Sequence, residues 1–225
     1  MLFLKTILNI IFPTRCVSCN IPGVDLCEAC ILECPSAERE SAKWIFPLFD
    51  YRYPLIKKTL WLLKYKGKKG LANIFAEILY EKILEELADL YLLDNFRDPL
   101  LIPIPLSSKR YRERGYNQAE LICKELENIN KLRHGAEINL KLEKNILIKP
   151  KETVHQAHIK NRRERLQNIV GSFSIKNPEE NKIKIENKNI ILIDDITTTG
   201  ATLAEAKKIL KQFGARKIIA ITVAH

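Results

Sequence analysis

IILIDDITTTGATLAEA, residues 190–206, runs four aliphatic residues directly into two adjacent carboxylates, Asp194 and Asp195. A loop rich in threonine follows, and then apolar residues recur at helical spacing as far as Gly214, which lies where a left-handed helix cap belongs. A second apolar run, KIIAITVAH at 217–225, completes a strand–loop–helix–strand unit. Such a unit predicts two parallel strands joined by a right-handed crossover, and therefore an α/β sheet.

The loop after the acid pair is suited to holding an anion. Ligands of open parallel sheets bind at the carboxyl ends of strands, where this acid pair lies. The loop leads into a helix N-terminus, whose N–H groups and dipole favour a phosphate. Its residues are Thr197, Thr198, Thr199, Gly200, Ala201 and Thr202. The two carboxylates suit a hydroxylated sugar beside that phosphate, or a magnesium ion that bridges further phosphates. A helix-capping turn is the alternative, but it explains only one of the two acids.

Four of the six cysteines form a C-x2-C-x7-C-x2-C pattern at Cys16, Cys19, Cys27 and Cys30. Two such pairs, joined by a short turn, predict a tetrahedral thiolate site for structural zinc. The alternative is two disulfides, which require an oxidising compartment. Cys34 is a possible substitute ligand, whereas Cys123 falls in a helical pattern and is expected to be a small buried apolar residue.

Length and charge limit the organisation of the chain. Its 225 residues fit one ordinary domain with a small appendage, and we expect an N-terminal helix and a four-cysteine zinc module over 1–40 and an α/β domain over 41–225. The net charge of +10 favours a polyanionic partner or a phosphorylated ligand, although a biased composition also explains it. The apolar run at residues 1–13 is too short to span a membrane and lacks a signal-peptide cleavage site. We therefore expect a cytoplasmic protein.

The rest of the chain shows further helical and strand patterns. Short strands are expected around Pro47, a helix from Pro54, and a strand within 99–105. Asn117 is placed to cap another helix, with Glu120 in its first turn. The polar insertion at 177–188 is expected to be a hairpin directed away from the site.

Several of these segments together resemble a known family. The loop IILIDDITTTGAT resembles the ribose-phosphate loop of type I phosphoribosyltransferases. The segments FPTRCVSCN…LCEAC, LKYKGKKGLA, IPIPLSSKRYRERGYNQAELI and TVHQAHIKNRRERLQNIVGSF follow in the order seen in the ComF family of competence-associated proteins. The resemblance covers most of the chain. It implies a type I phosphoribosyltransferase-like fold, with a mainly parallel sheet flanked by helices and a small zinc module at the N-terminus.

The resemblance also implies roles for individual residues. Asp194 and Asp195 match the acids that hold the ribose hydroxyls of phosphoribosyl pyrophosphate, and residues 197–202 match the loop that wraps its 5′-phosphate. The segment expected near the pyrophosphate is matched by Lys109, Arg110, Arg112, Arg114, Gly115, Asn117 and Gln118; a further polar motif is matched by Thr153, Gln156, Arg165 and Asn168. Purine-salvage members carry an acid where this chain has Thr198, and an alcohol cannot replace it in proton transfer, so purine salvage is disfavoured.

Three basic clusters, at 64–69, 109–114 and 160–165, suggest a groove for single-stranded DNA, with Tyr65, Tyr111 and Tyr116 available for stacking. Some of these cations also suit pyrophosphate: those of the cluster at 109–114, and Arg162, Arg163 and Arg165 of the cluster at 160–165. Solvated faces are the plainer interpretation of each cluster alone.

Three functions remain open from the sequence. The resemblance implies a factor that handles incoming DNA during natural transformation, with partners such as a competence helicase or another DNA-uptake protein. The others are an active phosphoribosyltransferase that uses Mg²⁺ and a non-catalytic sensor of phosphoribosyl pyrophosphate. No residue is an obvious base for activating an acceptor, which favours binding over catalysis.

Overall fold

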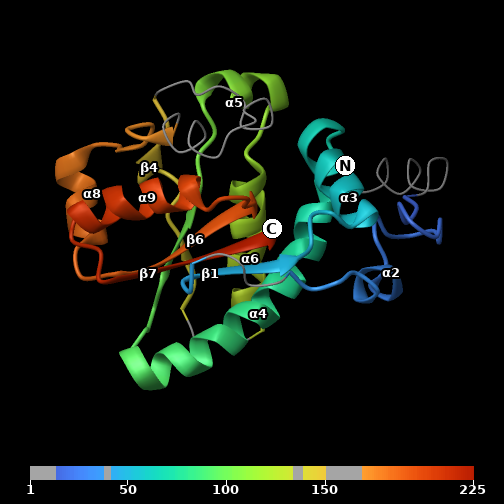
Figure 1. The fold of residues 1–225 in the computed structure, drawn as a ribbon, viewed down its shortest axis with the longest axis horizontal. Helices are drawn as coiled ribbons and strands as arrows, with labels where there is room; N and C mark the ends of the chain where they lie inside the picture. Colours follow the sequence, from blue (N-terminus) through green and yellow to red (C-terminus); the bar gives the residue numbers. More distant parts are fainter. Residues whose placement is uncertain (1–13, 38–41, 134–138, 151–168) are drawn as a thin grey trace.

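The computed structural model describes residues 14–37, 42–133, 139–150 and 169–225 (Figure 1). The helices are α2 (Glu28–Leu32), α3 (Pro54–Tyr65), α4 (Gly70–Asp94), α5 (Ser108–Arg114), α6 (Gln118–Leu132), α8 (Pro178–Ile185) and α9 (Ala201–Gln212). The strands are β1 (Ile45–Phe49), β2 (Leu100–Pro103), β3 (Lys141–Leu142), β4 (Leu147–Ile148), β5 (Ser174–Ile175), β6 (Asn189–Ile196) and β7 (Lys217–Ala224).

Five strands form one sheet in the order β1-β7-β6-β2-β3, and every neighbouring pair is parallel. β6 and β7 pair along most of their length, from Asn189 opposite Lys217 to Ile196 opposite Ala224. This confirms the strand–helix–strand unit expected at 190–225. Pro47 lies within the single strand β1, which is at the sheet edge, where a residue without an N–H is tolerated. β4 and β5 form a separate antiparallel pair.

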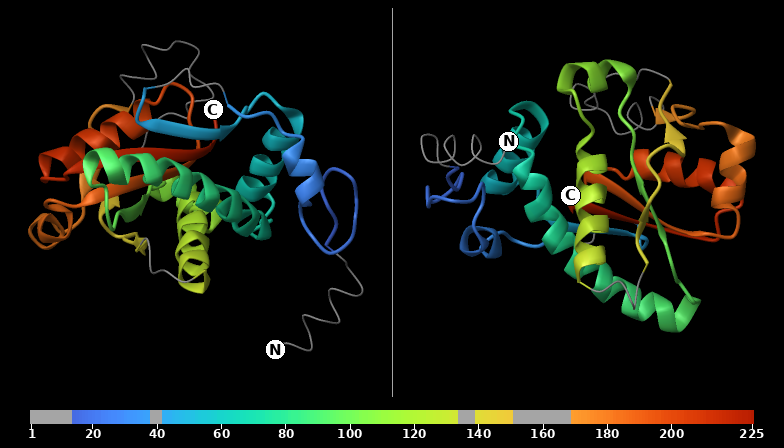
Figure 2. Two further views of the ribbon diagram at one scale, coloured as in Figure 1. Left: turned by 90° about the horizontal axis from the view of Figure 1, so that it is seen from below. Right: turned by 180° about the vertical axis from the view of Figure 1, so that it is seen from behind.

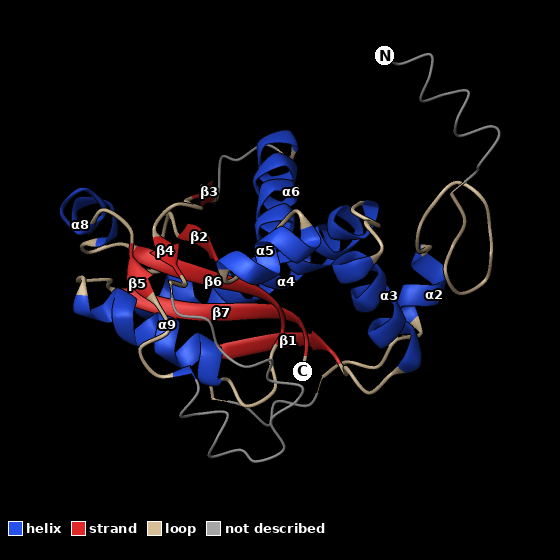
Figure 3. Cartoon of the chain, turned by 90° about the horizontal axis from the view of Figure 1, so that it is seen from above, coloured by secondary structure: helices blue, strands red, loops and turns tan. Residues whose placement is uncertain are grey.

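Alternate residues of β6 face the two sides of the sheet. Ile191 and Ile193 belong to an apolar cluster with α3, α4 and α6, whereas Ile190 and Leu192 belong to a second cluster with α9. The sheet therefore lies between helical layers, as Figures 2 and 3 show. Because both of its faces are covered, the strand is apolar at consecutive positions, which is typical of a buried parallel sheet.

The cysteine-rich segment packs on the main domain. Cys16, Leu26 and Ile31 are buried in the same apolar cluster as Leu60 of α3 and Phe75 of α4. Residues before and after position 40 therefore share one apolar core. The division of the chain at that point into two folding units stays a prediction.

One expected element is wrong. The polar insertion at 177–188 contains the helix α8 and no hairpin. Pro178 stands at the first helical turn, with Glu179 and Glu180 beside it and Lys182 and Lys184 in the last turn, an arrangement that suits the helix dipole.

No helix in the described parts of the chain combines the length and the apolar character needed to cross a membrane. The apolar run at residues 1–13 lies outside the described residues.

Candidate functional site

Asp194 and Asp195 lie near the carboxyl end of β6, at the edge of the sheet where ligands of parallel sheets bind. The backbone N–H of Asp195 donates a hydrogen bond to Asp194 Oδ1 (2.9 Å). Asp195 is buried, and its Oδ2 forms an ion pair with Nζ of Lys64 at 3.0 Å. Burial, followed by the adjacent Asp195 charge, raises the pKa of Asp194 to about 7, although Lys64 and Lys149 act in the opposite direction. The two acids thus lie close together, and the nearby lysines only partly offset the effects of burial and mutual repulsion on the pKa of Asp194.

The threonine-rich loop connects this acid pair to α9. Gly200 adopts a φ of +71°, and a Cβ at this position would meet Ile45 Cδ1 at 3.0 Å, so both its conformation and its surroundings favour glycine. Thr198 and Thr202 line a pocket beside the acids. Thr197 is buried, and its backbone N–H donates to the carbonyl of Ala224 (2.9 Å), while the Thr199 hydroxyl lies 3.4 Å from the Ala201 N–H at the helix start. The loop therefore presents two of its four threonines to the pocket.

The pocket has a volume of about 670 Å³. Its charged lining residues are Lys64, Arg110, Arg114, Lys149, Asp194 and Asp195. Its other lining residues are Tyr51, Leu60, Trp61, Tyr65, Ile104, Pro105, Leu106, Asn117, Gln118, Ile196, Thr198 and Thr202. The cations outnumber the two acids, so the pocket is suited to a ligand with several negative charges and hydroxyl groups.

The wall formed by α5 and the start of α6 comes from the basic segment at 109–118. Arg114 donates one hydrogen bond to Gln118 Oε1 (2.9 Å) and another to the hydroxyl of Tyr65 (3.2 Å). Gln118 is only 1% exposed, and its Nε2 has no hydrogen-bond partner among the described residues. A buried amide donor that lines a pocket in this state is available to a ligand acceptor.

The expected pyrophosphate segment divides between the pocket and the surface. Arg110 and Arg114 line the pocket, whereas Lys109 and Arg112 are exposed and are not among its lining residues. The N-cap of α6 is confirmed, because Asn117 Oδ1 accepts a hydrogen bond from the Ala119 N–H (3.1 Å). Arg162, Arg163 and Arg165 lie outside the described residues, as do Thr153, Gln156 and Asn168.

Lys64, Trp61 and Lys149 line the pocket but were not predicted as site residues from the sequence. Lys64 and Trp61 come from α3, and Lys149 follows β4. Lys64 lies within the segment LKYKGKKGLA, but only as one lysine of a basic cluster. Lys149 follows a stretch without clear periodicity, and its ammonium lies 5.2 Å from the ring centroid of Phe173.

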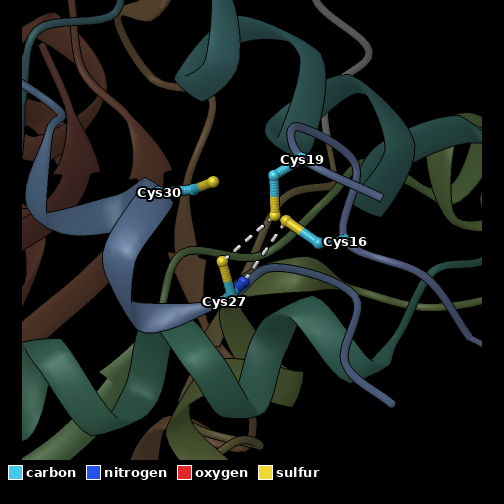
Figure 4. Close-up of side chains that lie close together, drawn as sticks. All are labelled: Cys16, Cys19, Cys27 and Cys30. Atoms are coloured by element: carbon cyan, nitrogen blue, oxygen red, sulfur yellow. Dashed lines mark hydrogen bonds between the residues drawn. The ribbon is translucent and has the colours of Figure 1, made fainter. Parts of the chain in front are cut away.

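The four N-terminal cysteines converge, as Figure 4 shows. Their sulfur atoms all lie within 4.8 Å of one another, close to the roughly 3.8 Å expected between thiolates around tetrahedral zinc. None of them is in a disulfide; Sγ of Cys19 and Sγ of Cys27 are 3.6 Å apart. Burial acts to raise the pKa of Cys16, but the backbone N–H groups of Cys19 and Cys27 contribute to lowering it to about 6.

The two remaining cysteines lie outside this cluster. Cys34 is buried, with its thiol 3.5 Å from the Cys30 carbonyl. Cys123 is fully buried in α6, as expected for a small apolar residue. The cluster of four is therefore a possible metal site that needs neither of them.

Comparison with known proteins places these features in a family. Residues 150–225 match the model of the phosphoribosyl transferase domain. The chain is 25% identical over 210 residues to the DNA utilization protein YhgH of Escherichia coli O6:H1, covering 91% of this chain and 81% of that protein. It is 32% identical over 160 residues to the competence protein ComFC of Bacillus subtilis, covering 71% of this chain and 55% of that protein. The chain belongs to the ComF family.

Membership of the ComF family agrees with the fold. The match to the phosphoribosyl transferase domain includes β6, the threonine-rich loop, α9 and β7, and the sheet is parallel throughout. The fold is therefore α/β and phosphoribosyltransferase-like, with a cysteine cluster at its N-terminal end. Among solved structures, the hypoxanthine-guanine phosphoribosyltransferase of Schistosoma mansoni with IMP is similar, with 14% identity, a TM-score of 0.36, and coverage of 68% of this chain and 55% of that one. The fold assignment rests on the domain match and the sheet topology.

Proposed function

We propose that this competence-associated protein binds phosphoribosyl pyrophosphate, or a similar phosphorylated ribose, in the pocket at the end of β6. The observation that supports this most is the convergence of three groups on one cavity: the acid pair, Thr198 and Thr202 of the loop, and Arg110 with Arg114. These come from three separate parts of the chain. Each group suits a different part of the ligand.

The assignment of ligand parts follows from charge and position. The 5′-phosphate would lie at the loop of 197–202, before α9, where the helix dipole favours an anion. The ribose hydroxyls would donate to Asp194 and Asp195, which offer only acceptor oxygens when ionised. The pyrophosphate would lie toward Arg110 and Arg114, whose guanidinium groups bind phosphate oxygens in pairs. Thr198 lines this pocket at the position where purine-salvage members carry an acid. An alcohol cannot replace that acid in proton transfer, so we do not propose purine salvage as the function of this protein.

Two metals fit the residues that are present. Carboxylate oxygens and ligand phosphates are the donors that Mg²⁺ prefers, so the acid pair would hold Mg²⁺ together with the ligand. The four thiols suit Zn²⁺ with no open position, which makes a structural role the natural one.

We favour binding over turnover. The described pocket residues include neither histidine nor glutamate, and the only carboxylates are the two assigned to ribose. Histidine and acidic side chains are the groups that most often act as the general base that activates an acceptor. An active transferase would release pyrophosphate in the presence of a suitable acceptor, which a coupled assay detects.

We further propose that single-stranded DNA binds to the aromatic face of α3, which also lines the pocket. Trp61 and Tyr65 are 47% and 50% exposed, and their ring centroids lie 6.2 Å apart on one face of α3. Lys66 lies over the Trp61 ring (5.3 Å) and Arg114 over the Tyr65 ring (5.0 Å). Aromatic rings interleaved with cations are typical of surfaces that stack bases and track a phosphate backbone. A role in natural transformation would bring this surface to incoming DNA, in company with a helicase or another uptake protein.

Calorimetric titration with phosphoribosyl pyrophosphate and Mg²⁺ tests the pocket assignment. We expect the double variant Asp194→Asn with Asp195→Asn to lose at least about tenfold in affinity, or roughly 1.4 kcal/mol. The matched control is Asp89→Asn with Glu179→Gln, which removes two exposed charges from α4 and α8 and should bind as the wild type does. Equal affinity of the wild type and the pocket variant, both folded, would place the ligand elsewhere.

A further inference from the structure

Lys64 reaches the acid pair from outside the sheet. It lies in the last turn of α3, and its Nζ is 3.0 Å from Asp195 Oδ2. The side chains of Lys64 and Asp195 are only 16% and 11% exposed, so this ion pair is shielded from solvent. Such a pair is much less screened than one on the surface. Lys64 is therefore held at the position where a ribose hydroxyl or a magnesium ion would approach Asp195.

The same ammonium lies within reach of an anionic ligand. Lys64 lines the pocket together with Arg110, Arg114 and Lys149. A lysine side chain is a compact charge with three donors on a flexible stem, so it exchanges partners with little rearrangement of the backbone. Phosphate oxygens in the pocket would offer it a partner with more negative charge than one carboxylate.

We propose that Lys64 is a positioning residue that exchanges partners: it neutralises Asp195 in the empty pocket and moves to ligand phosphate oxygens on binding, which releases Asp195. This rests on the proposed function, because it requires a phosphorylated ligand in the pocket. The exchange has two consequences. Without ligand, Lys64 opposes the binding of a divalent cation to the acid pair. With ligand, it contributes to affinity and frees a carboxylate for the ribose or for Mg²⁺.

The variant Lys64→Met separates these two consequences, because it should change the affinities for a divalent cation and for the phosphorylated ligand in opposite directions. Mn²⁺ takes the same oxygen ligands as Mg²⁺ and is followed by its EPR signal. We expect Mn²⁺ alone to bind more tightly to the variant, because the acid pair loses its internal cation. Phosphoribosyl pyrophosphate, titrated at fixed Mg²⁺, should bind at least about tenfold more weakly, because a charge-assisted contact is lost. Lys57→Met removes an exposed charge from the same helix and is the control.

A merely structural role for Lys64 predicts that both ligands bind more weakly, and that result would overturn the exchange. Unchanged affinity for phosphoribosyl pyrophosphate would overturn it as well. Lys64→Gln keeps a hydrogen-bond donor for Asp195 without the charge, so it provides the same test if the methionine variant does not fold. If the wild type does not bind phosphoribosyl pyrophosphate at all, the proposed function fails first. Binding by the wild type with no opposite shifts in the variants refutes only the role of Lys64.

Discussion

Asp194 is a single residue whose protonation links the pocket to stability. Its pKa of about 7 in the folded protein lies above its ordinary value of 3.8, first because of burial and then because of Asp195. The folded state therefore binds more protons than the unfolded state between these two values. Below pH 3.8, Asp194 is protonated in both states and does not change the free energy of unfolding. As the pH rises from 3.8 toward 7, Asp194 increasingly lowers that free energy, and the destabilisation is complete above pH 7.

The variant Asp194→Asn should remove this titration. We expect the free energy of unfolding of the variant, relative to the wild type, to rise between pH 4 and about 7 and then to level off. Urea unfolding at a series of pH values measures this difference. Asp89→Asn, an exposed position on α4, is the control and should show no comparable trend. A difference that stays constant over this range would mean that the folded pKa of Asp194 is ordinary.

At the residue scale, the residues that were singled out from the sequence and that line the pocket come from segments with a local motif. Asp194, Asp195, Thr198, Thr202, Arg110 and Arg114 line the pocket, and all belong to segments with a recognisable motif. Lys64 and Lys149 line it because α3 and the segment after β4 are brought to the end of β6 by packing. Such long-range placement leaves no periodic pattern in one sequence, and these two lysines are otherwise ordinary members of a basic chain.

Among the elements, α3 connects the cysteine cluster to the pocket. Nζ of Lys58, on this helix, donates to the Val17 carbonyl (2.6 Å), and Lys68, just beyond it, forms an ion pair with Asp25 (2.9 Å). Val17 and Asp25 lie within the loops that hold the four cysteines. The same helix supplies Trp61, Lys64 and Tyr65 to the pocket. Disorder in the cysteine loops should therefore loosen one wall of the pocket.

The variant Cys19→Ser tests this connection. We expect it to lose stoichiometric zinc, because a structural site with one ligand missing is weakened, and to bind phosphoribosyl pyrophosphate roughly threefold to tenfold more weakly. Elemental analysis and calorimetry in the presence of Mg²⁺ measure the two effects. Asp25→Asn keeps all four thiols and should keep the metal while showing part of the loss in affinity. Full ligand affinity in a zinc-free, folded variant would show that α3 is held independently of the metal.

Long periodic elements were predicted well, and short or polar ones were not. β6, α9 and β7 have strong apolar patterns, and they are found as expected. α8 was mistaken for a hairpin because its eight residues contain few apolar positions, so proline and charge placement were its main helix signals. β3, β4 and β5 have two residues each, which is too short for any period to show.

At the scale of the whole molecule, the net charge of +10 favours a polyanionic partner, and we propose the aromatic face of α3 as the place where single-stranded DNA binds. We expect single-stranded DNA to bind with little sequence preference, and with a slope of log affinity against log salt of roughly −0.7 per phosphate neutralised. Trp61→Ala should lower the affinity by about 1–3 kcal/mol, as expected for a stacked base, with little change in slope.

Reversing the charge of Arg162 and Arg163 should flatten the slope of log affinity against log salt. Fluorescence anisotropy over a range of salt concentrations measures both.

Tyr91→Ala is the matched control, because Tyr91 is an aromatic residue of similar exposure (45%) near the end of α4. Equal losses from Trp61→Ala and Tyr91→Ala would mean that α3 is not the stacking surface. An unchanged slope after the double arginine reversal would assign residues 160–165 to a solvated face.

We propose that one pocket at the end of β6 holds a phosphorylated ribose. A crystal structure of the protein with phosphoribosyl pyrophosphate and Mg²⁺ tests it most directly. We predict the 5′-phosphate at residues 197–202, the ribose hydroxyls on Asp194 and Asp195, and Lys64 moved from Asp195 to a phosphate oxygen. Crystals saturated with the ligand that show this pocket empty, or the ligand bound at another surface, would contradict the account.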